Sequence, residues 1–374
     1  MDIWAPVSAS APGGYGTWST TSPTWTDTNG DGPGPMSPQP GLAIFQGAPG
    51  TVSVDDSAGS VSVTGMQFAV DGYTLTGGVL TLTGSSGSSP IIDVGDGTSG
   101  SAGYKATINN VLAGDAGLVK NDFGTLVLTG ANTYTGGTTI NAGTLALTGT
   151  GSIATSNYVE DDGSFDISGT TNGASISNLK GDGSVLLGNQ TLTLVNGSSE
   201  FDGVISGTGG LSLSDHAVVV LGGANTFTGL TTINTGTALQ VGIGGTGASM
   251  AGDVLDNGSL EFFHSDNIDY GGVISGTGSL VQEGTGTLTL TGSNTFGGGV
   301  TVLGATLNGV VLNSTLAVSN NANLGASSGT VTLNNGLLEN TASFTLTHPV
   351  VLNSSGVPGV GGTFQTDSGT VLTV

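Results

Sequence analysis

Short runs in which apolar residues alternate with threonine or another small residue recur along this chain, each bounded by glycine. Four such runs, GVLTLTG, GTLVLTG, GTLALTG and GTLTLTG, begin at Gly78, Gly124, Gly143 and Gly286. A period of two with many β-branched residues is typical of β-strands, whose side chains point to opposite faces in turn. Leu126 and Leu128 are therefore expected on one face, with Val127 on the other. No comparable helical period of 3.6 is present, so the pattern predicts an all-β chain.

A longer stretch occurs three times, at residues 117–141, 210–234 and 278–302, and begins in the first copy as GLVKNDFGTLVLTGANTYTGG. The equivalent asparagines are Asn132, Asn225 and Asn294, and the offsets between them are 93 and 69. The difference, 24, is close to one third of 69. This spacing predicts a stacked structural unit of roughly 23 residues, because only an array tolerates the gain or loss of a whole unit.

Parallel coils fit this spacing best. Each strand would pair with the same strand of the next coil at roughly 4.8 Å, which places Leu126 and Leu145 on adjacent coils. Glycine and asparagine would form the corners, where a positive φ is needed. Tyr134, Phe227 and Phe296 hold the same place in the three copies and are expected at equivalent corners. An antiparallel sandwich is the alternative, although it would favour tighter turns than the loops between these runs.

The first 50 residues differ in composition from the rest of the chain. They are rich in proline, serine and tryptophan, with five prolines between Pro33 and Pro49. We expect residues 1–50 to form an irregular N-terminal cap without regular strands, and residues 51–374 to form the coils. The cap would lay Trp4, Trp18 or Trp25 over leucines that the first coil otherwise exposes.

Composition limits the possible partners and the chemistry. With 70 glycines and 36% hydrophobic residues in 374, a large globular core is not expected, while the regular recurrence of leucine and valine argues against disorder. The net charge is −23, with three lysines and no arginine, which excludes nucleic acid and anionic membrane surfaces as partners. The absence of cysteine excludes disulfides and thiolate metal sites. No apolar run approaches the length that a membrane-spanning helix needs, and the first residues do not resemble a signal peptide.

The segment GTLVLTGANTYTGGTTINAGTL, residues 124–145, resembles the passenger-associated strand repeat of bacterial autotransporters, and residues 15–32 are similar to the start of such passengers. The resemblance implies a right-handed parallel β-helix that is exported through its own outer-membrane barrel and displayed on, or released from, the cell surface. It also implies adhesion or self-association. No barrel sequence is recognised, so we interpret the chain as a passenger segment that ends before any translocator barrel.

Parallel β-helices include polysaccharide lyases and hydrolases, so catalysis has to be considered. A chain without arginine cannot use the arginine base of families that resemble pectate lyase, and glycoside hydrolysis needs two facing carboxylates. The candidate carboxylate clusters are Asp55 with Asp56, Asp93 with Asp96, Glu160 with Asp161 and Asp162, and Asp266 with Asp269. Neighbours in a strand point to opposite faces and the wider pairs suggest turns, so solvated corners are the favoured interpretation.

Serine and histidine chemistry is equally weakly indicated. Residues 325–329, GASSG, match the nucleophile motif GxSxG, but that motif needs a following helix and none is expected. His216, His264 and His348 are far apart and lack metal-ligand spacing. A structural or surface role is expected for His216, and a bend at His348, which precedes a proline. The sequence therefore predicts no catalytic residue and no cofactor.

One weak metal signal remains. Asp27, Asn29 and Asp31 fit the first half of a calcium loop, D-x-N-x-D-G, which spans residues 27–32. The glutamate expected at the twelfth position is replaced by Pro38. A polar turn is the simpler interpretation, and calcium is the alternative.

The leading functional hypothesis is a non-enzymatic, extracellular β-helix that acts as an adhesin stalk or self-association module. Its polar faces would contact a glycan or protein on a host or neighbouring cell, or a second copy of the chain, through many weak hydrogen bonds. Two alternatives stay open. The first is a glycan-active enzyme of the polysaccharide hydrolase type, whose carboxylates converge from neighbouring coils, and the second is a passive spacer or folding scaffold for another domain.

Overall fold

The computed structural model describes residues 1–374 except 7–11, 28, 86, 308–309, 313 and 354–360. Its secondary structure consists of β-strands and two short 3₁₀ helices, η1 (Ser99–Gly103) and η2 (Asn321–Leu324), within this described part. The chain forms two compact units, Met1–Leu192 and Thr193–Val374. None of the described helices is long and apolar enough to cross a membrane.

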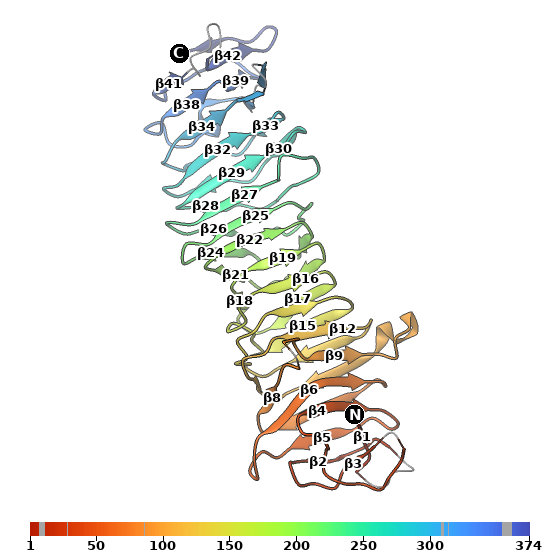
Figure 1. Cartoon of the computed structure of the whole chain (residues 1–374). Coiled ribbons are helices and arrows are strands. Elements are labelled where there is room, and N and C mark those ends of the chain that lie inside the picture. The colour runs from red at the N-terminus through yellow and green to blue at the C-terminus, as the bar shows by residue number, and fades with distance from the viewer. Residues whose placement is uncertain (7–11, 28, 86, 308–309, 313, 354–360) are drawn as a thin grey trace. The chain divides into compact units, whose positions relative to one another are not determined.

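Two ladders of parallel strands build the first unit (Figure 1). The first ladder contains β1 (Asp2–Trp4), β4 (Gly41–Phe45), β6 (Val61–Phe68), β9 (Ile91–Val94), β12 (Leu118–Asn121), β14 (Thr138–Ile140), β16 (Val159–Asp161) and β19 (Leu179–Gly181). The second contains β2 (Gly16–Trp18), β5 (Thr51–Val54), β7 (Tyr73–Gly77), β10 (Lys105–Ile108), β13 (Thr125–Leu128), β15 (Thr144–Gly149), β17 (Ser164–Thr170) and β20 (Ser184–Leu186). The remaining strands up to the unit border are β3 (Trp25–Thr26), β8 (Leu80–Leu82), β11 (Leu112–Ala113), β18 (Ala174–Ile176) and β21 (Leu192–Val195).

The second unit has three such ladders. The first contains β22 (Ser198–Phe201), β25 (Val218–Leu221), β27 (Ala238–Val241), β29 (Ser259–Phe263), β32 (Ser279–Glu283), β34 (Val300–Leu303), β38 (Val331–Asn334) and β41 (Val350–Asn353). The second contains β24 (Leu211–Ser214), β26 (Thr231–Ile233), β28 (Val254–Asp256) and β31 (Ile274–Ser275). The third contains β30 (Ile268–Tyr270), β33 (Thr287–Leu290), β37 (Thr315–Val318), β39 (Leu337–Asn340) and β42 (Thr363–Thr366). The remaining strands are β23 (Val204–Ser206), β35 (Ala305–Leu307), β36 (Val310–Leu312), β40 (Phe344–Thr345) and β43 (Leu372–Thr373).

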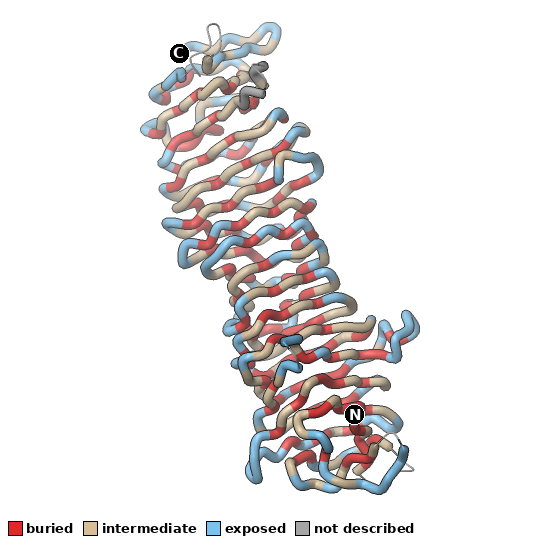
Figure 2. Tube along the Cα trace, viewed as in Figure 1, coloured by how far each residue is buried: buried red, intermediate tan, exposed pale blue. Residues whose placement is uncertain are grey.

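The predicted parallel β-helix is confirmed. Leu126 pairs with Leu145 on the adjacent parallel strand, and both are fully buried. Buried and more exposed residues alternate along most strands (Figure 2). Val127 is the exception to the predicted pattern, since it is only 4% exposed although it points away from Leu126. The outer side of β13 is therefore covered at this position, although Thr125 on the same face is half-buried.

The coil is shorter than the spacing of the repeat copies predicts. Hydrogen bonds between neighbouring coils join Leu112 to Asn132 and Ile205 to Asn225, and the members of each pair are 20 positions apart in the sequence. Loops lengthen single coils, as between Asn294 and Asn323, where the separation is 29. The prediction was wrong because the first two copies are not separated by a whole number of coils. Strands between them pair at separations of 19 to 21 positions, as Thr125 does with Thr144 and Thr138 with Val159, and no whole number of such coils makes 93.

The asparagine that recurs in the three copies ties neighbouring coils together. Asn132 Oδ1 accepts a hydrogen bond from the backbone N–H of Leu112 (2.9 Å), while its Nδ2 donates to the carbonyls of Gly130 and Ser152 (both 3.0 Å). Asn225 repeats all three bonds with Ile205, Gly223 and Ser249. The side chain is buried in both copies, so it satisfies backbone groups that water cannot reach.

The third copy keeps part of this arrangement. Asn294 accepts a hydrogen bond from the N–H of Ile274 (2.8 Å) and donates to the carbonyl of Asn323. In the first two copies the asparagine also donates to the carbonyl two residues before it. In the third copy Asn323 makes this bond instead, by donating to the carbonyl of Gly292. The aromatic residue two positions after each of the three asparagines is fully buried, as expected for equivalent corners.

One corner differs between the copies by a single hydroxyl group. The hydroxyl of Tyr134 lies 2.7 Å from that of Thr138, and both residues are buried. The equivalent Phe227 has no hydroxyl, and the buried hydroxyl of Thr231 has no partner within the described residues. An unpaired buried hydroxyl costs free energy that a partner would recover.

We therefore expect Phe227→Tyr to raise the free energy of unfolding by about 1 kcal/mol, the net value of one buried hydrogen bond. Chemical denaturation of the purified chain measures the change. The reverse substitution, Tyr134→Phe, should lower stability by less, because the Thr138 hydroxyl keeps a second partner in the Ser156 hydroxyl at 3.0 Å. A loss of stability in Phe227→Tyr would show that this corner has no room for the hydroxyl.

The N-terminal region is more regular than predicted. Residues 1–50 contain β1 to β4, and β1 and β4 pair in parallel as members of the first ladder, so the expectation of no regular strand was wrong. The prolines lie between these strands, which leaves the five residues after Pro40 free to pair. The division into regions at residue 50 stays a prediction.

The three tryptophans of this region are buried, as expected, and they pack around an aromatic residue, while their packing over leucines stays a prediction. The ring centroids of Trp4, Trp18 and Trp25 lie 6.2, 6.1 and 5.7 Å from that of Phe45. Phe45 in turn stacks on Phe68, with centroids 4.8 Å apart. Edge-to-face and stacked rings of this kind supply much apolar contact. The first unit therefore begins with an aromatic cluster.

Candidate functional site

A groove in the first unit combines an exposed aromatic ring with polar side chains from successive coils. We call it the Phe123 groove. It has a volume of about 410 Å³ and is lined by Gln67, Asp93, Asp96, Gly97, Asn121, Asp122, Phe123 and Ala142. Asp93 pairs in register with Gln67 on one side and with Asn121 on the other. These three side chains therefore form a row along β6, β9 and β12, with neighbouring strands about 4.8 Å apart.

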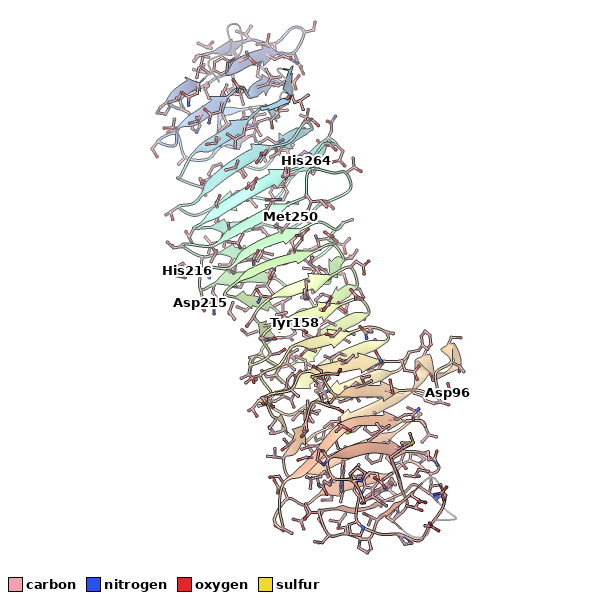
Figure 3. All side chains as sticks on the ribbon, viewed as in Figure 1. Asp96, Tyr158, Asp215, His216, Met250 and His264 are labelled. Atoms are coloured by element: carbon pink, nitrogen blue, oxygen red, sulfur yellow. The ribbon has the colours of Figure 1, made fainter. Side chains whose placement is uncertain are left out.

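The two ends of the groove are held by Asp122. This residue has a φ of 64°, and its carboxylate accepts hydrogen bonds from the N–H of Gly97 and of Phe123, both at 2.8 Å. The first bond fixes the start of the loop that carries η1, beside which Figure 3 shows Asp96. The second fixes the turn that presents Phe123, a residue that is 45% exposed. The groove is thus prearranged by a contact between segments that are distant in the sequence.

Beneath the groove lies the buried Lys120, which sequence reasoning did not single out. Its Nζ donates to the carbonyls of Asn121 (2.6 Å), Asp122 (2.7 Å) and Ala142 (3.1 Å). Burial lowers the pKa of Lys120 to about 8, although the negative charges of Asp122 and Asp93 act to raise it. Burial, and then the Asp122 carboxylate, raise the pKa of Asp93 above its ordinary value. With its three donors engaged, the ammonium group supports the turn from below.

A second surface depression in the same unit, the Tyr158 groove, has a volume of about 530 Å³. It is lined by Thr83, Gly84, Gly87, Ser88, Ser89, Asp115, Ala116, Gly117, Gly136, Gly137, Asn157 and Tyr158. A Cβ at Gly137 would lie 2.0 Å from the Tyr158 ring, so this position requires glycine. Lys180 Nζ lies 4.5 Å from the ring centroid and forms an ion pair with Glu160 at 3.1 Å. The Tyr158 ring therefore already has close neighbours in Gly137 and Lys180.

The weak calcium candidate is an exposed turn. Asp27 Oδ1 accepts hydrogen bonds from the N–H of Asn29 (2.9 Å) and Asp31 (3.1 Å), and its Oδ2 accepts from the Asn29 side chain (3.1 Å). The Asp31 N–H above all lowers the pKa of Asp27. Thr28, inside this motif, lies outside the described residues. Calcium binding by Asp27, Asn29 and Asp31 stays a prediction, and the described residues elsewhere hold no cluster of three potential metal ligands.

The carboxylate clusters named from the sequence are spread over turns and strands. Asp55 and Asp56 are exposed and accept backbone N–H bonds from Ser57 and Val79. Asp93 lies on a strand and Asp96 on the following turn. Asp269 is exposed, and Asp266 accepts a hydrogen bond from the N–H of Gly247 at 3.0 Å.

Asp161 contradicts the interpretation as a solvated corner. It is fully buried, one of its carboxylate oxygens accepts the N–H of Gly163 (3.2 Å), and the other has no partner in the described chain. Burial raises its pKa to about 7. Asp256 has the same arrangement with Gly258 (2.9 Å), and burial raises its pKa to about 6. Both aspartates stand in the same sequence pattern, V-x-D-[DN]-G-S, at residues 159–164 and 254–259. This shared pattern is the sequence feature from which their common buried position could have been recognised.

Two carboxyl groups lie on neighbouring strands of the second unit. Glu261 on β29 pairs in register with Val281 on β32, and Glu283 on β32 pairs with Phe263 on β29. Burial, and then Glu283, raise the pKa of Glu261 to about 7. Glycoside hydrolysis requires two carboxyl groups on either side of a bound sugar. Neither the Phe123 groove nor the Tyr158 groove is lined by Glu261 or Glu283.

The serine and histidine candidates do not form a catalytic arrangement. Residues 325–329 follow η2 and precede β38, so a 3₁₀ helix comes before this turn and a strand after it, the reverse of the nucleophile elbow. His348 Nδ1 lies 3.0 Å from Asn321 Oδ1, and its buried Nε2 has no partner in the described structure. A nucleophilic serine would need a hydrogen bond to such a nitrogen.

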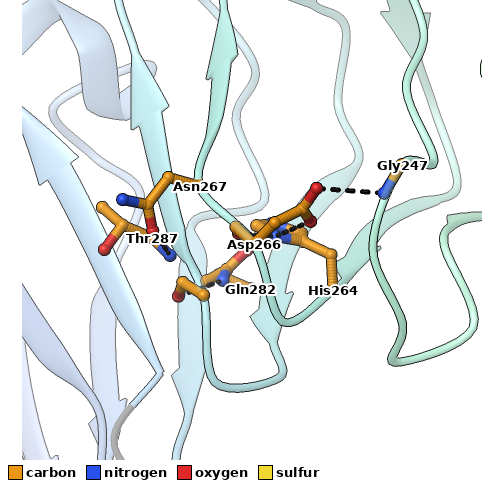
Figure 4. Close-up of polar contacts among 7 residues, drawn as sticks. Gly247, His264, Asp266, Asn267, Gln282 and Thr287 are labelled. Carbon is orange, nitrogen blue, oxygen red and sulfur yellow. Dashed lines mark hydrogen bonds and ion pairs between the residues drawn. The ribbon is translucent and has the colours of Figure 1, made fainter.

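The other two histidines have different surroundings. His216 is exposed at a turn with a φ of 66°. His264 is fully buried, and its Nδ1 lies 2.5 Å from the carbonyl of Asp266 (Figure 4). Asp266 binds the N–H of Gly247 on the coil before, and Asn267 binds the N–H of Thr287 on the coil after (3.2 Å). This polar cluster holds three coils together, which is a structural role.

The comparisons with known proteins agree with the repeats seen in the sequence. The family described as passenger-associated-transport-repeat matches the chain at residues 118–147, 217–241 and 280–308. The chain is similar to the adhesin BmaC autotransporter of Brucella suis biovar 1 (strain 1330), with 39% identity over 285 residues. The aligned part covers 75% of this chain and 8% of that relative. No solved structure matches the chain significantly.

These repeats and the parallel β-helix define the class of protein, an autotransporter passenger. The chain belongs to the autotransporter passengers that carry passenger-associated repeats, as the resemblance predicted. Passengers of this family are exported to the cell surface, so this segment is extracellular.

Proposed function

We propose that this chain is a non-enzymatic segment of an adhesin, which carries a contact surface on a stiff ladder of coils and remains attached through its parent chain to an outer-membrane barrel. The observation that carries the proposal is the repeated β-helix together with a relative named as an adhesin. Asparagine-bound corners and stacked leucines give rigidity. The outer faces present polar rows from which many weak hydrogen bonds can be made.

Charge limits the partner. With a net charge of −23 and three lysines, of which Lys120 is buried, the surface repels nucleic acid and anionic membrane. A glycan or protein of a host or neighbouring cell, or a second copy of the chain, fits better. A polysaccharide hydrolase is less well supported, because Glu261 and Glu283 line neither of the two grooves and His348 has no serine partner within the described residues.

The test is to display the parent protein on a bacterium that lacks adhesins, with and without residues 1–374, and to count attached bacteria on host-cell layers. We expect the deletion to lower attachment at least about tenfold, because the contact surface is lost. Sedimentation of the purified chain tests self-association in parallel. Attachment that survives the deletion would favour the spacer alternative, and turnover on a polysaccharide panel would favour the enzyme.

A further inference from the structure

We propose that the Phe123 groove is a binding subsite for a glycan that carries no acidic groups. This inference rests on the proposed adhesin function and names the ligand class and the site. The groove differs from the Tyr158 groove in offering an aromatic ring with no ring or cation contact among the described residues, on a residue, Phe123, that is 45% exposed.

The polar row beside Phe123 has free hydrogen-bonding capacity. Within the described chain, neither the amide of Gln67 nor the carboxylate of Asp93 makes a side-chain hydrogen bond, although both line the groove. Asn121 Oδ1 accepts a bond from Asn141 Nδ2 at 2.7 Å, which fixes the orientation of its amide. The Nδ2 donors of Asn121 are then left for a ligand. Amide donors and carboxylate acceptors thus alternate along three coils.

Sugar hydroxyls match this alternation. Each hydroxyl group both donates and accepts, so a row of them can donate to Asp93 and accept from Gln67 and Asn121. A lysine or arginine side chain of a basic peptide has donors only, and it would leave both amide donors unpaired at a cost. The apolar face of a sugar ring can cover Phe123, which gains from removal of its exposed ring from water.

Charge selects among glycans. Asp93, Asp96 and Asp122 line the groove, while the ammonium group of Lys120 is buried and held by three carbonyls. Sialylated or sulfated glycans would bring further negative charge to these carboxylates and be repelled. The geometry therefore points to neutral sugars.

The experiment is binding of the purified chain to an array that contains neutral oligosaccharides of glucose, galactose and N-acetylglucosamine, sialylated and sulfated glycans, and an oligolysine peptide. We expect binding to at least one neutral series. Phe123→Ala should weaken it at least about tenfold, the loss typical of removing a central aromatic contact. Phe123→Trp should preserve it, and Leu186→Ala, which truncates another exposed apolar residue of the same unit, should leave it unchanged.

Thermal unfolding of each variant separates a lost contact from a lost fold. Binding to oligolysine alone, to acidic glycans alone, or to neutral glycans with equal strength in Phe123→Ala would overturn the inference. Cell attachment is measured with the same variants. If wild type promotes attachment but binds no neutral glycan, the subsite fails while the adhesin function stands. If neutral glycans bind through Phe123 but attachment does not depend on residues 1–374, the adhesin function fails and the subsite stands.

Discussion

Asn132→Asp is expected to lower the free energy of unfolding at pH 7.5 by about 3 kcal/mol or more. The substitution keeps the shape of the side chain and the acceptor for the N–H of Leu112. It removes both donated bonds and turns a carboxylate oxygen towards the carbonyls of Gly130 and Ser152, each 3.0 Å from Nδ2 in the wild type. The position is 4% exposed, so water cannot replace the lost donors.

Urea denaturation at two pH values measures this effect. At pH 4 part of the penalty should disappear, because a protonated aspartate can again donate one hydrogen bond. Asn172→Asp is the matched control, since Asn172 is exposed and a surface change of this kind alters stability by less than about 0.5 kcal/mol. Equal stability of the two variants at pH 7.5 would contradict the role assigned to the repeat asparagine.

Asp256→Asn is expected to stabilise the chain at pH 7.5 by about 2 kcal/mol and to have a much smaller effect at pH 4. Burial raises the folded-state pKa of Asp256 from 3.8 to about 6, so folding favours the protonated form. The stability associated with this group is fully present below pH 3.8 and is lost as pH rises through about 6. Asparagine removes the ionisation, and its amide keeps the oxygen that accepts the N–H of Gly258.

Unfolding curves from pH 4 to pH 8 check the prediction. Wild type should lose stability between pH 4 and pH 6, and Asp256→Asn should reduce that slope. The control is Asp269→Asn, an exposed aspartate of the same unit, which should leave the slope unchanged. A gain that is equal at pH 4 and pH 7.5 would show that ionisation of Asp256 is not the cause.

Repetition made a large part of the fold predictable. The asparagines of the three copies, the aromatic residues that follow them, and the pairing of Leu126 with Leu145 were all visible as repeated segments in the sequence. Stacked coils place equal residues over one another, so a local pattern is also a three-dimensional one. The class of protein was predicted from the same repeated segments.

The candidate site was only partly predictable. Asp93 and Asp96 were visible as a carboxylate pair, but their meeting with Phe123 and Gln67 depends on register. The stretch of chain from Gln67 to its partner Asp93, and the stretch from Asp93 to Asn121, are both longer than the usual coil. The burial of Asp161 was missed because its exposed neighbour Asp162 made the pair look like a solvated turn.

The sequence by itself determined the all-β class, the parallel stacking and the repeated corner residues, since alternation and glycine placement act over a few neighbouring positions. Only the tertiary structure decided the true length of the coil, the burial of Asp161 and Lys120, and the packing of three tryptophans on Phe45. Each of these depends on which residues of different coils come to lie side by side. Loops of unequal length set that register, and it becomes known only when the strands pair.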